Sequence, residues 1–374
     1  MPTTLYADSP RPAHRPRRTL AVALAVGVLL AAGCSSGKKA AGPTSTKPSK
    51  PTTTVPLVHK GAAPDPTVPK GVPIAPLTGL AIHPQLAVFR PALAVKVDNL
   101  DAPHESARPQ AGIADADIVF EEIVEGNITR LVAVFQSAIP ARIGPVRSAR
   151  TTDPILLSQL DRPLFAWSGG NGYVVGAVHA SPLRDFGEDA FPSAYGRDHS
   201  RRAPHNLFLT PGLIYDHAPA DAKAPRPLFS YRATGEKLSK LARATKGVRI
   251  TFGGGAASPT VEYQYDPHVD GWRRSQNGTT HVDDQGKIVA PRNVLIVFTN
   301  YVQSPADRKS PEAASVGSGT VWLLSKGEVV AGTWTRATPE SHYVLKDQKG
   351  GLIKLTPGQT WVELPRPGGA TLLD

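Results

Sequence analysis

The chain has 374 residues, too many for one ordinary hydrophobic core, so we expect two folded domains plus extensions. The formal net charge is +11, but residues 1–70 hold ten Lys or Arg and only two Asp or Glu, which leaves +3 for the remainder. Because the folded part is nearly neutral, the composition excludes a general polyanion-binding surface, and we expect no nucleic acid partner.

The N-terminus has the order of charges and apolar residues that is typical of an export signal. Four arginines between residues 11 and 18 precede an uncharged run over 20–32. That run has 13 residues, whereas a membrane-spanning helix needs roughly 20. Gly33 and Cys34, the only cysteine of the chain, follow it and complete the sequence Leu-Leu-Ala-Ala-Gly-Cys, which resembles a lipobox. We therefore expect a signal peptide over 1–34 and lipidation at Cys34; the alternative is an ordinary signal peptide with a leftover buried cysteine.

Residues 35–75 are rich in Pro, Thr, Ser, Lys, Ala and Gly and contain almost no large apolar side chains. Such a segment cannot bury enough surface to offset the entropy of ordering. It predicts a disordered tether between a lipid anchor in the cell membrane and extracytoplasmic folded domains. A single cysteine also excludes a disulfide within the chain, despite this location.

The first folded domain is expected over 76–224. A buried strand over 92–97 ends in Asp98 and Asn99, a polar pair that suits either a binding site or a simple turn. Two further strands, over 116–125 and 128–135, meet at Gly126-Asn127 and predict a hairpin that carries Glu121, Glu122 and Arg130. Since side chains alternate across a strand, Glu121 and Glu122 must point to opposite faces, and we expect one of them to pair with Arg130 or with the arginines that follow.

The segment over 141–150 holds three arginines, Arg142, Arg147 and Arg150, around Gly144-Pro145. The residues from 148 to 153 resemble the start of a helix, whose backbone N–H groups attract anions. If the Gly-Pro turn folds the arginines together, their guanidinium groups can bind one phosphate or carboxylate. A surface network of ion pairs is the alternative.

A second anion motif follows the predicted helix over 152–160. The strand over 164–167 leads into Ser168-Gly-Gly-Asn-Gly172 and then into a short helix that reaches His179. Backbone amides of such a loop can bind anions, although a plain tight turn explains the same residues. Further along, His205 and Asn206 are candidate site residues; His205 titrates near neutral pH and suits general acid–base chemistry, or it is a structural hydrogen-bonding residue.

The second domain is expected over 225–374. After a short helical piece over 235–246, short strands alternate with turn signals, which favours a meandering antiparallel sheet. Asp266, His268 and Asp270 have alternate spacing, but Pro267 favours a loop over a metal site, so we expect no metal. Trp272, Trp322, Trp334 and Trp361 suit core packing unless two of them gather on one exposed face and form a sugar-stacking surface. The sequence thus predicts a mixed α/β (α+β) N-terminal domain and a β-rich antiparallel C-terminal domain.

Several of these segments, in the same order and spacing, resemble the YerB-type bacterial lipoproteins. The segments begin at Pro76, Arg90, Ala107, Ala116, Gly126 and Ile143, and the resemblance covers about residues 76–374. The resemblance implies a lipoprotein built from two domains of unknown function, and it implies no catalytic residue.

Two functions agree with the sequence. The first is a membrane-anchored envelope lipoprotein that binds an anionic or glycopolymer ligand, or a protein partner, without a cofactor. The second is a metal-independent hydrolase or transferase, in which the arginines stabilise charge while Asp98, Glu121 or His205 moves protons. No nucleophile elbow, zinc-protease motif, catalytic cysteine or Walker loop is present in the sequence. Convergence of these acidic groups and His205 on the arginines in one cleft distinguishes the second function from the first.

Overall fold

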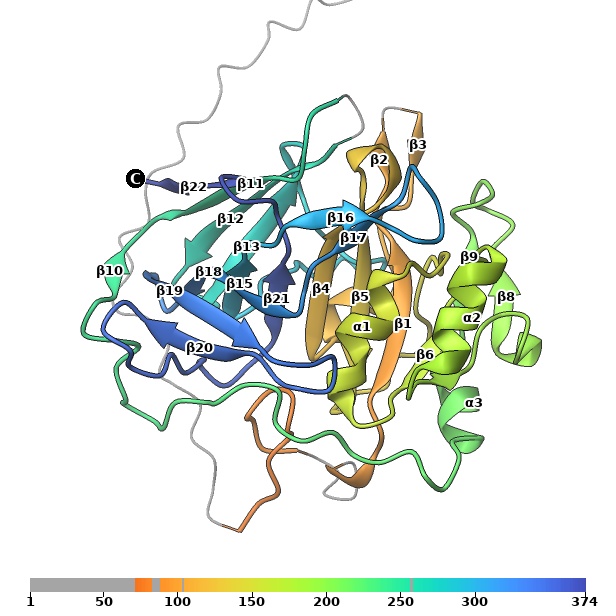
Figure 1. Cartoon of the computed structure of the whole chain (residues 1–374), viewed down its shortest axis with the longest axis horizontal. Helices are drawn as coiled ribbons and strands as arrows, with labels where there is room; N and C mark the ends of the chain where they lie inside the picture. Colours follow the sequence, from red (N-terminus) through yellow and green to blue (C-terminus); the bar gives the residue numbers. More distant parts are fainter. Residues whose placement is uncertain (1–70, 83–87, 103, 256–257) are drawn as a thin grey trace, which may run out of the picture. The chain divides into compact units, whose positions relative to one another are not determined.

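Strands from both halves of the chain share one large mixed sheet in the computed structural model, which describes residues 71–82, 88–102, 104–255 and 258–374 (Figure 1). The sheet has eleven strands; β20 (Val344–Asp347) pairs with β19, outside the main order. The main order is β10 (Arg243–Ala244), β19 (Glu328–Arg336), β18 (Gly317–Ser325), β15 (Asn293–Val297), β21 (Thr360–Glu363), β4 (Ile118–Ile123), β5 (Thr129–Phe135), β1 (Leu93–Asp98), β6 (Leu164–Ala166) and β7 (Arg184–Asp185).

A second, five-stranded antiparallel sheet packs against one face of the large sheet. Its order is β14 (Thr279–Thr280), β13 (Gly271–Gln276), β12 (Thr260–Asp266), β11 (Gly247–Thr251) and β22 (Ala370–Leu373). The remaining strands form three short pairs: β2 (Asp101–Ala102) with β3 (Glu105–Ser106), β8 (Tyr195–Arg197) with β9 (Leu207–Leu209), and β16 (Tyr301–Gln303) with β17 (Pro311–Ala313).

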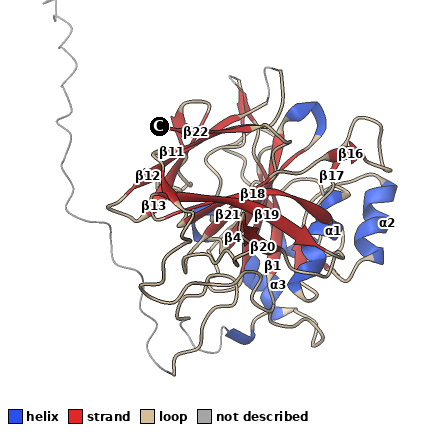
Figure 2. Cartoon of the chain, turned by 60° about the vertical axis from the view of Figure 1, so that its left-hand side comes forward, coloured by secondary structure: helices blue, strands red, loops and turns tan. Residues whose placement is uncertain are grey.

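The described residues contain few helices. These are α1 (Thr152–Leu157), α2 (Gly172–Ala180) and α3 (Pro211–Asp216), with 3-10 turns at Ile113–Asp115, Glu125–Asn127, Ser158–Leu160 and Pro192–Ala194. Figures 1 and 2 show the three helices beside the N-terminal strands, on the opposite side of the molecule from β11, β12 and β22. None of the described helices combines the length and the apolar composition that crossing a bilayer requires.

The alternation of side chains along the strands creates two cores. Val95 and Val97 of β1 face the five-stranded sheet and pack with Val248 and Val261. Ala94 faces the other way, into a core shared with the helices and with the C-terminal strands. The polar side chains of Asp98 and Asn99, at the end of β1, therefore start on opposite faces of the sheet.

The predicted hairpin and the predicted helix after the arginines are confirmed. β4 and β5 pair antiparallel around Gly126 and Asn127, both with positive φ, and α1 with its 3-10 extension spans 152–160. The C-terminal half is mostly strand, as expected, but β21 is parallel to both of its neighbours, β15 and β4, so the expectation of a purely antiparallel meander is wrong. Pairing with distant strands decided this arrangement, and local turn signals carry no information about it.

The prediction of a helix over 235–246 is also wrong. This segment consists of turns and the two-residue strand β10. Ser239 donates to Asp347 of β20, and the Arg232 side chain donates to the carbonyl of Glu236. Tertiary contacts of this kind override a weak helical preference.

Candidate functional site

The arginine segment lies at the carboxyl ends of three parallel strands, β1, β6 and β7. β6 pairs with β1 only as far as Val95. Beyond Val95, the arginine segment lies beside β1 in place of β6: Asp98 N donates to Pro145 O at 2.9 Å, and Arg147 N donates to Lys96 O at 2.9 Å. The loop after β6 joins the same edge, because Ser168 N donates to Arg147 O at 2.9 Å. Ligands of open sheets commonly bind outside the carboxyl ends of parallel strands, so this edge is a candidate binding site.

Asp98 and His205 form a buried ion pair at this edge. His205 Nδ1 lies 2.7 Å from Asp98 Oδ2, and its Nε2 lies 2.8 Å from Glu105 Oε1. The hydrogen bond to Asp98 raises the pKa of His205 above its ordinary value. Burial raises the pKa of Asp98, but the His205 hydrogen bond and the Arg147 charge outweigh it, so this pKa is lowered overall. His205 thus links β1 and β3; its neighbour Asn206 accepts a hydrogen bond from Arg197 at 3.3 Å.

Arg130 and Arg147 keep unused hydrogen-bond donors at this site. Arg130 is only 4% exposed, and its Nη1 donates to Ser148 O at 2.9 Å, but its Nε has no partner and it forms no salt bridge with any carboxylate of the described residues. Burial, followed by the charges of Arg150 and Arg147, lowers the pKa of Arg130 to about 10. The Arg147 side chain is 25% exposed; its Nε lies 2.9 Å from Asp98 Oδ2 in a salt bridge that lacks the geometry of a hydrogen bond, and neither Nη donates to a described residue.

The guanidinium nitrogens of Arg150, in contrast, all donate hydrogen bonds to acceptors of the protein. Its Nε and Nη2 donate to the two oxygens of Glu125, both at 2.6 Å, and Nη1 donates to Ala149 O at 2.7 Å. Burial raises the pKa of Glu125, but the bonds from Arg150 and Ser310 outweigh it and lower that pKa to about 2. This pair lines a hollow of about 310 Å³ together with Ser148 and the glycine loop at Gly170 and Asn171. The two predicted anion motifs therefore meet in space.

Arg142 does not join the other two arginines, which corrects the prediction that all three share one anion. Its guanidinium pairs with Asp284 at 2.8 Å and Asp198 at 3.2 Å and lies over the Phe208 ring. Gly144-Pro145 does not fold the segment back. The segment stays extended, with bridges from Ile143 to β9 and from Val146 to β1, and five extended residues span roughly 16 Å.

Glu121 and Glu122 point to opposite faces, as predicted, but neither pairs with Arg130 or with the arginine segment, which corrects that expectation. Glu121 Oε2 accepts from Arg274 Nη2 of β13 at 2.7 Å, and its Oε1 accepts from Asn99 Nδ2 at 2.9 Å. Glu122 pairs with Lys96, which also donates to Asp153 at 2.7 Å. Both pairs are fully buried, so Glu121 and Asn99 hold the two sheets together rather than lining the carboxyl edge.

Asp266 and Asp270, two of the three alternately spaced residues for which we expect no metal, form ion pairs. Asp270 contacts Arg292 and Lys326, and Asp266 contacts Arg273. Among the residues that the structure describes, no group of three or more His, Cys, Asp or Glu has the arrangement of a metal site.

Comparison with known proteins identifies the family of the chain. Residues 77–224 match a family described as "Protein of unknown function (DUF3048) N-terminal domain", and residues 248–362 match the corresponding C-terminal domain. The chain belongs to this family. It is 30% identical over 298 residues to "Putative lipoprotein YerB" of Bacillus subtilis (strain 168), which covers 78% of this chain and 85% of that protein. The crystal structure of the Bacillus subtilis YerB protein superimposes with a TM-score of 0.70 at 28% identity, covering 81% of this chain and all of the other.

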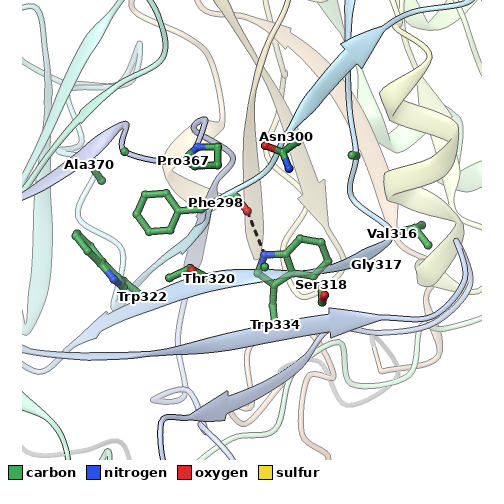
Figure 3. A pocket seen from close by; sticks show the side chains of 13 residues that line it. Phe298, Asn300, Val316, Gly317, Ser318, Thr320, Trp322, Trp334, Pro367 and Ala370 are labelled. Carbon is green, nitrogen blue, oxygen red and sulfur yellow. Dashed lines mark hydrogen bonds between the residues drawn. The ribbon is translucent and has the colours of Figure 1, made fainter.

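The structure of this chain contains a larger hollow that the sequence did not locate. A cleft of about 600 Å³ is lined by Trp322 and Trp334 together with Phe298 (Figure 3). Trp272, Trp334 and Trp361 are buried in the core, which is the default role for a tryptophan on a strand, whereas Trp322 is only partly buried. The sequence analysis considered all four tryptophans as candidates for a sugar-stacking surface. Which of them border a cleft depends on the different lengths of neighbouring strands, which the sequence does not reveal.

Proposed function

We propose that this chain is a lipid-anchored protein of the cell envelope and that its folded part binds an anionic group at the carboxyl edge of β1 and β6. The N-terminal charge pattern and the name of the Bacillus relative support an anchor at Cys34 and an extracytoplasmic location. The ligand would be a phosphate or carboxylate of an envelope polymer, or of a protein partner, and it would bind beside Arg147 and Arg130.

One observation carries the proposal: Arg130 is buried without a carboxylate partner among the described residues. Burying a charge without a direct partner is costly, and burial lowers the pKa of Arg130 although the charges of Asp98 and Glu125 act in the opposite direction. Arg147 lies beside it and is partly exposed, and neither of its Nη groups donates a hydrogen bond within the described part of the chain. An anion that contacts both guanidinium groups would supply the missing partner, with charge-assisted bonds of about 1.5 to 3 kcal/mol each.

The positions and burial of the residues considered for hydrolysis favour a binding function over a catalytic one. Asp98 and His205 are 2% and 4% exposed and use their polar atoms on one another, on Arg147 and on Glu105. Glu121 belongs to the opposite face of the sheet, where it pairs with Arg274. Asp98 and His205 thus meet Arg147 but are buried, and Glu121 lies apart from them on the other face of the sheet.

The test is calorimetric titration of the folded protein with glycerol phosphate and with poly(glycerol phosphate) at low and moderate salt. Replacing Arg147 by Gln should weaken binding about tenfold or more, since one charge-assisted contact is lost. Arg142→Gln is the matched control, because it removes the same charge from the same segment at a position with its own carboxylate partners. Equal binding by both variants and the parent, with unchanged melting temperatures, contradicts the proposal.

A further inference from the structure

The cleft between the end of β15 and the turn at Pro367 exists because two paired strands differ in length. β18 begins at Gly317, but its last pair with β15 is Val297 with Val321. The first four residues of β18 therefore have β19 on one side only, and Phe298 N donates the last bond across the gap, to Thr320 O at 3.1 Å. Beyond that bond, the free edge of β18 faces the cleft (Figure 3).

Aromatic rings form the walls of this cleft. The Phe298 and Trp322 rings meet edge to face with centroids 5.1 Å apart, and Trp334 Nε1 donates to Phe298 O at 3.2 Å (Figure 3). Gly319 makes this packing possible, because a Cβ there would lie 2.6 Å from Trp334 Nε1. Trp334 is thus fixed in the wall, whereas Trp322 is only partly buried and keeps accessible ring surface.

The lining has polar groups but no charge. Asn300, Ser318 and Thr320 contribute an amide and two hydroxyl groups, and none of the thirteen lining residues is Asp, Glu, Lys, Arg or His. A hollow without charged side chains suits an uncharged polar ligand. The volume of about 600 Å³ lies inside the range of roughly 300–1,000 Å³ that small-ligand sites occupy.

We infer that this cleft binds a neutral carbohydrate chain, with one sugar ring lying against Trp322. A sugar ring has an apolar C–H face that packs on the electron-rich face of an indole, and hydroxyl groups at its rim that need donors and acceptors. The amide of Asn300 and the hydroxyls of Ser318 and Thr320 supply both. This site shares no residue with the proposed anion site, and it requires no charge on the ligand.

An extended peptide fits the same edge less well. In an antiparallel strand only alternate residues direct their N–H and C=O groups to one side. Thr320 O already accepts a bond from Phe298 N, so Ser318 is the next residue of β18 whose backbone groups face the cleft. β18 begins at Gly317, so no further residue of the strand has its backbone groups on that side. One residue offers too few main-chain bonds for strand addition, which relies on a row of them.

Titration with neutral tetrasaccharides tests the inference, using oligomers of N-acetylglucosamine, glucose, mannose, galactose and arabinose up to about 10 mM, a limit that reaches weak millimolar sites. At least one should bind and change the tryptophan emission of the full folded protein. Trp322→Ala should weaken that binding about tenfold or more, which equals about 1.4 kcal/mol. Tyr173→Ala is the matched control, because Tyr173 is 54% exposed on α2 and does not line the cleft.

Asn300→Ala provides a second variant that keeps the core intact, since Asn300 is exposed and, among the described residues, only its backbone carbonyl accepts a hydrogen bond, from the N–H of Ala314. This substitution should weaken the binding of the same sugar several-fold and leave the melting temperature of the protein unchanged. Failure of all five tetrasaccharides to bind overturns the inference. Binding that survives both cleft substitutions, or a preference for a neutral extended peptide over every sugar, also overturns it.

Discussion

Replacing Arg274 by Met should destabilise the whole fold, because Arg274 links the two sheets through a buried ion pair. The guanidinium is fully buried on β13; it donates to Glu121 Oε2 of β4 at 2.7 Å and to Gln276 at 2.8 Å, and it lies over the Trp361 ring. Removing one partner of a buried pair leaves an uncompensated charge and costs about 3 to 5 kcal/mol. At roughly 2 °C per kcal/mol for a folded part of this size, we expect a fall in melting temperature of about 6 to 10 °C.

Thermal unfolding followed by circular dichroism measures this effect, with Arg249→Met as the matched control. Arg249 pairs with Glu262 at 2.6 Å on the same five-stranded sheet, but its side chain is 54% exposed, so its loss should cost at most about 1 kcal/mol. Adding Glu121→Gln to Arg274→Met should recover part of the loss, since the remaining partner is then uncharged. A melting temperature for Arg274→Met no lower than that of Arg249→Met refutes the reasoning.

Three further predictions concern the anchor, the tether and the carboxyl edge. Cys34→Ala should release the protein from membranes or block its processing, and a variant that fractionates with membranes like the parent contradicts the anchor. Limited proteolysis should first remove the residues before 76, so a resistant product that starts near residue 35 contradicts the tether. Because its hydrogen bond to Asp98 raises the pKa of His205, the stability that His205 contributes should be fully present below about pH 6.5 and lost as the pH rises through the folded pKa. Urea unfolding between about pH 6 and 9 should show that slope in the parent and less of it in His205→Gln; equal slopes contradict the charged role of His205.

Local patterns predicted much of the N-terminal half. The alternation along β4 placed Glu121 and Glu122 on opposite faces, and Gly126-Asn127 fixed the hairpin. The strand pattern also placed Asp98 at the end of a strand, which is where Arg147 contacts it in the structure. These features depend on residues that are near in sequence, so a single chain contains the information.

Features that depend on distant partners were not predictable in this way. Glu121 pairs with a residue 153 positions away, and β21 lies between β15 and β4, which belong to different halves of the chain. The separation of Arg142 from Arg147 follows from bridges to β9 and β1 rather than from the Gly-Pro pair. The division at residue 225 stays a prediction about independent folding, although the two family matches end and begin on either side of it.

The location of a bound tetrahedral anion tests the central claim most directly. Crystals of the folded part soaked in sodium selenate would reveal the anion by the anomalous scattering of selenium. We predict a peak about 3 Å from the Nη atoms of Arg147 and within reach of Arg130, and its absence in crystals of Arg147→Gln. A selenate found only at Arg142 or elsewhere on the surface, with the edge of β1 and β6 empty, would contradict the account.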